Sequence, residues 1–231
     1  GECDIVVGTH ALLNNKIKFK KLGMLIIDEE QHFGVSQKEK IKSLRSNVHV
    51  LALTATPIPR TLQMSLVGLR DLSIISTAPL NRQNINTEVI DFNNKKITSA
   101  IESEINRDGQ LYYVCPRINE LKEVEDFLKH NLPNIKYQVA HGQMSPKKLK
   151  NTMIDFYNNE FQLLLCTTIV ESGLDLQKTN TMIIHNADKF GLSQLYQLRG
   201  RIGRSNIEAF CYYTVKDLNG ISENAYKRLM L

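Results

Sequence analysis

The sequence predicts an α/β fold made of two halves, each built around a parallel β-sheet. Short apolar runs rich in β-branched residues alternate with segments whose apolar residues recur at helical spacing, the pattern of parallel strands joined by crossover helices. Most of these runs are apolar throughout, as expected of strands that are covered on both faces. At 231 residues and 42% hydrophobic composition, the chain is long enough for one large domain or two compact ones.

Ten apolar runs are predicted to be strands, and three segments between them are predicted to be helices with a core-facing stripe. The strands are residues 5–7, 24–27, 48–53, 72–76, 87–92, 110–115, 136–140, 162–166, 181–185 and 209–215. The stripes are formed by Ile97, Ile101 and Ile105, then by Leu121, Val124, Phe127 and Leu128, then by Leu149, Met153, Phe156 and Tyr157. Because each stripe follows helical spacing, burial in the core explains it best.

Residues 77–86, TAPLNRQNIN, interrupt the periodicity with proline and asparagine, which is typical of a linker. We therefore expect a first half over residues 1–77, a linker over 78–86 and a second half over 87–221, with residues 222–231 as the start of a helix. The first half has too few strands for a complete nucleotide-binding sheet, so we expect it to be truncated. The second half has a full alternation of strands and helices.

The composition argues against several classes of protein. No run approaches the roughly 20 apolar residues of a membrane helix, and the first residues lack a signal-peptide pattern, so we expect a cytoplasmic protein with no membrane partner. The four cysteines form no CxxC pair, which argues against a zinc site, and three lie in strand-like runs as expected of buried thiols. The net charge of +5 is compatible with a polyanionic partner but does not establish one.

Two carboxylates, Asp28 and Glu29, follow the apolar run MLII. Ligands of open parallel sheets bind just beyond the carboxyl ends of the strands, where an aspartate can hold Mg²⁺ and a glutamate can orient an attacking water. A solvated acidic turn is the alternative explanation. A second run ends in Thr54 and Thr56, whose hydroxyls can relay between a nucleotide site and a neighbouring domain or simply cap a helix.

The segment at residues 191–204, GLSQLYQLRGRIGR, carries the strongest signal. Two glycines interrupt its helical pattern at a cost of about 1 kcal/mol each, so we expect close approach of phosphates or of another backbone to select them. We predict that Arg201 and Arg204, three residues apart, share one helix face and reach a triphosphate. A solvated basic helix is the alternative.

A further polar cluster, TTIVESGLD at residues 167–175, follows the apolar run QLLLC. The hydroxyls of Thr167 and Thr168, and a backbone that Gly173 leaves open to close approach, can bind a phosphate backbone without recognising its sequence. A polar loop between a strand and a helix is the alternative.

Taken in order, these segments and two others resemble the motifs of superfamily 2 helicases: GTH at 8–10, DEEQ at 28–31, TATP at 54–57, HGQM at 141–144, TTIVESGLD at 167–175 and QLRGRIGR at 197–204. Longer stretches, such as DEEQHFGV and TATPIPRTLQMSLVGLRDLSII, resemble the bacterial transcription-repair coupling factors most closely, and the RecG branch-migration helicases next. The resemblance covers nearly the whole chain. It implies two RecA-like parallel-sheet domains of the P-loop NTPase type, the first truncated, with ATP between them and double-stranded DNA across them.

The resemblance also implies roles for individual residues. Asp28 would hold Mg²⁺, Glu29 would activate the hydrolytic water, and Gln31 would sense the nucleotide. The remaining roles are as follows: Arg201 and Arg204 would reach the γ-phosphate with Gln197 nearby, Gly173 and Asp175 would lie at the nucleotide, Thr54 and Thr56 would couple hydrolysis to domain movement, and Thr9, His10, Thr167 and Thr168 would face the DNA backbone.

One departure from the family pattern is large. No glycine in the chain is followed by lysine, so the 231 residues contain no G-x-x-x-x-G-K-[ST] phosphate loop; in the family that loop precedes the GTH segment.

The resemblance therefore implies the motor core of an ATP-dependent DNA translocase that displaces stalled RNA polymerase and helps recruit an excision-repair damage-recognition protein, both bound through regions outside this chain. Because the phosphate loop is missing, we expect the chain alone to be inactive. The alternatives are a RecG-like fork-reversal helicase and a non-catalytic remnant of such a gene.

Overall fold

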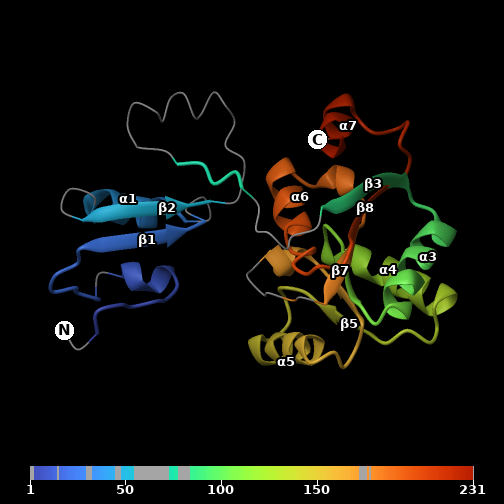
Figure 1. The fold of residues 1–231 in the computed structure, drawn as a ribbon, viewed down its shortest axis with the longest axis horizontal. Coiled ribbons are helices and arrows are strands. Elements are labelled where there is room, and N and C mark those ends of the chain that lie inside the picture. The colour runs from blue at the N-terminus through green and yellow to red at the C-terminus, as the bar shows by residue number, and fades with distance from the viewer. Residues whose placement is uncertain are drawn as a thin grey trace. The chain divides into compact units, whose positions relative to one another are not determined.

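The computed structural model describes residues 3–14, 16–29, 33–44, 48–54, 73–77, 84–171, 176 and 178–230. Contacts divide the chain into unit 1 (Gly1–Leu69) and unit 2 (Arg70–Leu231), and Figure 1 draws both as ribbons. The first strand of the unit 2 sheet begins at Ile85, two residues before the predicted start of the second half. The predicted limits of the two halves and of the linker between them are not tested by this division.

Unit 1 is built around two parallel strands, β1 (Met24–Asp28) and β2 (His49–Leu53), with helix α1 (Val35–Leu44) between them in the chain. A short 3-10 helix, η1 (His10–Leu13), precedes β1. Of the apolar side chains described in unit 1, only Ile27 and Ile41 are buried. The described part of this unit therefore has a very small core.

Unit 2 contains a six-stranded sheet in the order β3-β8-β7-β4-β6-β5, with every neighbouring pair parallel. The strands are β3 (Ile85–Asp91), β4 (Gln110–Val114), β5 (Tyr137–Ala140), β6 (Leu163–Cys166), β7 (Thr179–Ile184) and β8 (Ala209–Val215). Strands β4, β6 and β7 are buried along their whole length. Cover on both faces explains why β6 is uniformly apolar and why β4 and the end of β7 are largely apolar.

Helices cover both faces of this sheet. The helices α3 (Asn94–Asn106) and α4 (Ile118–Asn131) pack on one face, and α5 (Pro146–Tyr157), α6 (Leu192–Arg199) and α7 (Glu223–Leu229) pack on the other. Two short 3-10 helices, η3 (Thr168–Glu171) and η4 (Ala187–Lys189), follow β6 and β7. Side chains of Asn93, Ser145 and Ser222 cap α3, α5 and α7 by accepting from a backbone amide.

The predicted helical stripes are confirmed, with one exception. The stripe residues of α3, α4 and α5 are buried or pack against the core, apart from Tyr157. Tyr157 is 66% exposed because it directly follows the buried Phe156, and consecutive residues of a helix point about 100° apart. The prediction for Tyr157 was therefore wrong.

Two of the predicted strands are also wrong. Residues 5–7 and the described part of the run at 72–76 are not strands, and Ile5, Val7, Ile74 and Ile75 are more than two-thirds exposed. An apolar run becomes a strand only where a neighbouring strand accepts its backbone hydrogen bonds, and neither run has such a neighbour in the described residues. The other eight runs correspond to β1 to β8.

The cysteine prediction agrees with the structure. Cys115, Cys166 and Cys211 are buried free thiols, and Cys3 is an exposed free thiol. Among the helices that the structure describes, none is both long enough and apolar enough to cross a bilayer.

Candidate functional site

The acid pair, Asp28 and Glu29, lies at the carboxyl end of β1 beside the end of β2. Asp28 is in register with Leu53, and the Glu29 amide donates to the Leu53 carbonyl oxygen at 3.0 Å. Thr54 directly follows Leu53, so the acid pair and this hydroxyl residue lie at the same edge of the unit 1 sheet. Sequence reasoning predicted this grouping from the position of each residue after an apolar run.

The backbone of Glu29 is in the left-handed region, with φ of 52°. This region is uncommon for residues other than glycine, and a residue held there costs about 1–3 kcal/mol. Such residues are concentrated at functional sites. The strain at Glu29 therefore supports a functional role for this residue over a solvated acidic turn.

A magnesium ion bound to a nucleotide fits the acid pair. Among the described residues, no three His, Cys, Asp or Glu side chains form a complete metal site. Mg²⁺ at a nucleotide needs no such cluster, because one or two carboxylates hold it together with phosphates and waters. The exposed Asp28 carboxylate at the end of a parallel strand is a ligand of this kind.

Three of the residues at the carboxyl edge of the unit 2 sheet are held by ladder hydrogen bonds. The amides of Cys115, Thr167 and His185 donate to carbonyl oxygens of neighbouring strands at 2.8, 3.3 and 2.8 Å. Thr167 is only 8% exposed, whereas Thr168 begins η3 and is half-buried. Thr168 is thus more accessible than Thr167, and both were predicted to face DNA.

The arginine segment, residues 200–204, lies beyond the end of a helix. Helix α6 ends at Arg199, and Gly200 is its C-cap, so the prediction that Arg201 and Arg204 share a helix face was wrong. Gly203 has φ of +68°, and an added Cβ would lie 3.0 Å from Ile85. The glycines therefore end the helix and permit close packing of the backbone, instead of interrupting a continuous helix.

The arginine segment is anchored in the unit 2 core. Leu195, Leu198 and Ile202 are buried as predicted, and Arg204 donates from Nη2 to the Gly200 carbonyl oxygen at 3.3 Å. Burial raises the pKa of the Tyr112 hydroxyl on β4, and the charges of Arg201 and Arg204 oppose that rise.

The segment packs on β3 and β8, because Gly203 lies close to side-chain atoms of Ile85 and Ala209. Gln197 lies within α6 and is half-buried.

The remaining predicted site residues either lie at the start of η1 or fall outside the described residues. The Thr9 hydroxyl accepts from the Ala11 amide at 3.3 Å and caps η1, whose first residue is the exposed His10. Thr9 therefore has a structural role in addition to the predicted DNA contact. Four further residues lie outside the described part of the chain, namely Gln31, Thr56, Gly173 and Asp175.

A polar cluster after β7 was not predicted. The carboxylate of Glu120 on α4 accepts from Asn186 Nδ2 at 2.7 Å and from Lys189 Nζ at 3.0 Å. Asn186 has a left-handed backbone with φ of 48°. Asn186 lies just beyond the end of a predicted strand, as the acid pair does. The same sequence signal could therefore have predicted this cluster.

Two family models match the chain. Residues 1–65 match a DEAD/DEAH box helicase model, and residues 93–206 match a model described as helicase conserved C-terminal domain. Together they cover parts of both units. The acid pair lies within the first match and the arginine segment lies within the second.

Relatives and solved structures agree with these matches. The transcription-repair-coupling factor of Rickettsia typhi (strain ATCC VR-144 / Wilmington) is 53% identical over 99% of this chain, and that of Staphylococcus haemolyticus (strain JCSC1435) is 50% identical; the chain spans 20% of either protein. A structure of RecG bound to a three-way DNA junction is 34% identical and has a TM-score of 0.74, covering 98% of this chain and 30% of that one.

A more distant solved structure has the same fold. S. cerevisiae Dbp5 L327V bound to RNA and ADP BeF3 is 15% identical with a TM-score of 0.69, over 95% of this chain and 61% of that one, and this likeness concerns the fold alone. The chain is therefore a homologue of the transcription-repair-coupling factors, with the parallel-sheet α/β architecture of RecA-like helicase domains.

Proposed function

We propose that the chain is the motor segment of an ATP-dependent double-stranded DNA translocase that couples transcription to DNA repair by displacing stalled RNA polymerase in the cytoplasm. The name of its relatives, and their identity of 50–53% to this chain, support the role in coupling transcription to DNA repair. The observation that carries the motor function is the acid pair beside Thr54 at the carboxyl edge of β1 and β2. RNA polymerase and the damage-recognition protein would bind regions outside this chain.

Residues of unit 1 would prepare the hydrolytic water. When bound, Mg²⁺ neutralises charge on the phosphates of ATP. Asp28 would hold the ion through water, Glu29 would orient and deprotonate the attacking water, and Gln31 would sense the nucleotide. Thr54 and Thr56 would couple the change of nucleotide state to movement of the units.

Residues of unit 2 would stabilise the transition state. Arg201 and Arg204 would approach the γ-phosphate with Gln197 nearby, because guanidiniums present several donors to phosphate oxygens. Gly173 and Asp175 would lie at the nucleotide. An arginine that acts in this way contributes about 10³-fold or more to the rate.

DNA would be bound through its phosphates. Thr9, His10, Thr167 and Thr168 would face the backbone, with Thr168 more accessible than Thr167. Contacts of this kind carry no sequence information. Binding is therefore expected to weaken steeply with salt and to be the same for unrelated sequences.

The chain alone should hydrolyse ATP poorly, because its 231 residues contain no phosphate loop and Glu29 would have no positioned substrate. We expect phosphate release by the purified chain to be slower than that of a full-length relative by much more than about tenfold. Turnover within about tenfold of the full-length rate would contradict the assigned roles.

A RecG-like fork-reversal helicase is the second candidate, and the similarity to the RecG structure bound to a three-way junction favours it. Substrates separate the two in the full-length protein that carries this sequence. Release of a stalled transcription complex supports the first function, and activity restricted to forked DNA supports the second. A non-catalytic remnant would act on neither substrate.

A further inference from the structure

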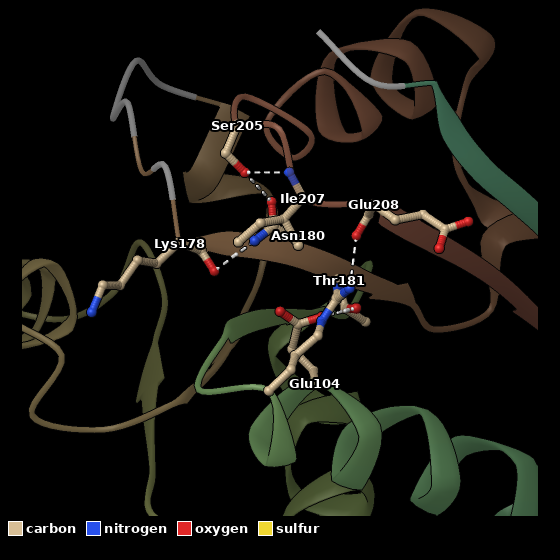
Figure 2. A network of polar contacts seen from close by, with 8 residues as sticks. Glu104, Lys178, Asn180, Thr181, Ser205, Ile207 and Glu208 are labelled. Carbon is tan, nitrogen blue, oxygen red and sulfur yellow. Dashed lines mark hydrogen bonds and ion pairs between the residues drawn. The ribbon is translucent and has the colours of Figure 1, made fainter. Parts of the chain in front are cut away.

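The backbone that follows Arg204 is fastened to the start of β7 by side-chain hydrogen bonds. Ser205 Oγ donates to Asn180 Oδ1 at 3.0 Å, and the Ile207 amide donates to Ser205 Oγ at 3.3 Å. Asn180 is 1% exposed, and its Nδ2 donates to the Lys178 carbonyl oxygen at 3.2 Å. Figure 2 shows these hydrogen bonds as dashed lines that link Ile207, Ser205, Asn180 and Lys178.

The same stretch is fastened again at Glu208, three residues further on. The Glu208 carbonyl oxygen accepts from Arg107 Nη1 at 2.9 Å, and its carboxylate accepts from Asn86 Nδ2 at 2.5 Å. Arg107 is itself paired with the buried carboxylate of Glu104, which also accepts from the Thr181 hydroxyl. Two separate attachments therefore hold the four residues after Arg204.

The backbone before Arg204 is equally confined. Gly203 adopts φ of +68° and packs so closely on Ile85 and Ala209 that an added Cβ would lie 3.0 and 3.3 Å from their side-chain atoms. The Cα position of Arg204 is thus set on its N-terminal side by packing on β3 and β8, and on its C-terminal side by Ser205.

We propose that Asn180 and Ser205 are positioning residues that hold Arg204 in the geometry needed at the transition state; this rests on the proposed function of Arg204. Side chains that stabilise a transition state must be held within about 0.5 Å of the productive geometry, and a shift of about 1 Å can cost 10²-fold in rate. The Ser205–Asn180 hydrogen bond is made by the residue that directly follows Arg204. Its loss should therefore affect the chemical step and leave ATP binding unchanged.

The test compares three serine variants in the full-length protein that carries this sequence. Ser205→Ala removes the hydrogen bond, and Ser205→Thr retains a hydroxyl for rescue. Ser222→Ala is the matched control, because Ser222 Oγ also accepts a backbone amide, that of Ala225, at 3.3 Å but lies at the start of α7, away from Arg204 in the chain. Arg204→Ala is measured alongside.

We expect Ser205→Ala to lower kcat by about tenfold to 10²-fold with an unchanged KM for ATP. Ser205→Thr should restore most of kcat, and Ser222→Ala should lower the melting temperature without changing kcat. Hydrogen exchange of the Ile207 amide in the 231-residue chain gives a readout that needs no activity, and it should become faster in Ser205→Ala only.

The outcomes separate the two proposals. If Arg204→Ala lowers kcat strongly while Ser205→Ala behaves like Ser222→Ala, the positioning role is wrong and the proposed function stands. If Arg204→Ala leaves kcat unchanged, the role of the arginine segment in the proposed function is wrong. A rise in KM equal to the fall in kcat for Ser205→Ala also contradicts the positioning role.

Discussion

The two units present their site residues on very different supports. In unit 2 the central strands β4, β6 and β7 are buried on both faces, and the arginine segment is packed on that sheet. In the described part of unit 1, the buried apolar side chains are Ile27 on β1 and Ile41 on α1. The apolar residues that are exposed on its two strands are Met24, Ile26, Leu51 and Leu53. The groups expected to act on the phosphates are thus rigidly supported, whereas the acid pair lies on a sheet with little core.

The contrast shows that a strand's sequence does not determine how far its side chains are buried. The runs at β2 and at β6 both form strands and are mostly apolar, but in the described part of the chain only β6 lies between two helical layers. Local stability follows the number of buried apolar contacts. We therefore expect unit 1 to open more readily than unit 2.

The largest expected effect comes from removing a leucine side chain in each unit. Leu164 of β6 is fully buried and Leu51 of β2 is 44% exposed. Leu164→Ala should lower the free energy of unfolding by about 3 kcal/mol, since it leaves a cavity, and Leu51→Ala should lower it by about 1 kcal/mol or less. Urea unfolding and hydrogen exchange of the strand amides measure the two losses. Equal losses would show that both sheets are supported alike.

A smaller effect is expected at His185, which follows β7. Burial lowers the pKa of its imidazole, and among the nearby charges Glu123 and Glu120 oppose this shift while Lys189 and Lys216 add to it. Neither ring nitrogen has a hydrogen-bond partner in the described residues. The folded state therefore holds a neutral His185 that the unfolded chain protonates near its ordinary pKa of 6.5.

A histidine whose pKa is lowered by folding contributes fully to stability when the pH is above the pKa that it has in the unfolded chain. That contribution is lost as the pH falls below about 6.5, with a slope of at most about 1.4 kcal/mol per pH unit. His185→Leu should flatten the pH dependence of the unfolding free energy of unit 2 between pH 7 and 5. The exposed His130, replaced in the same way, is the control. An unchanged slope in His185→Leu would contradict the assignment.

Much of the unit 2 fold could be predicted from the sequence, because its strands and helices are covered on the faces that the pattern predicts. The stripe of α4 and the run at β8 are examples. Residues 5–7 and 72–76 could not be predicted correctly, since strand formation depends on a partner strand that the local sequence does not specify.

The site was predicted in part for the same reason. Asp28, Glu29 and Thr168 were predicted from position alone, because each lies at or just beyond the end of a strand, and their roles remain predictions. The shape of the arginine segment was missed, since helical spacing continues through Ile202 although Gly200 ends the helix. The contact between Asn180 and Ser205 spans 25 residues and leaves no local pattern in the sequence.

The proposed function requires that the acid pair and the arginine segment act on one triphosphate. A double-mutant cycle in the full-length protein that carries this sequence tests it most directly, with Glu29→Gln, Arg204→Ala and the combination compared in single-turnover ATP hydrolysis. Because groups that serve one transition state are strongly non-additive, we expect the double variant to be within about tenfold of the slower single variant. A loss equal to the product of the two single losses would contradict the account.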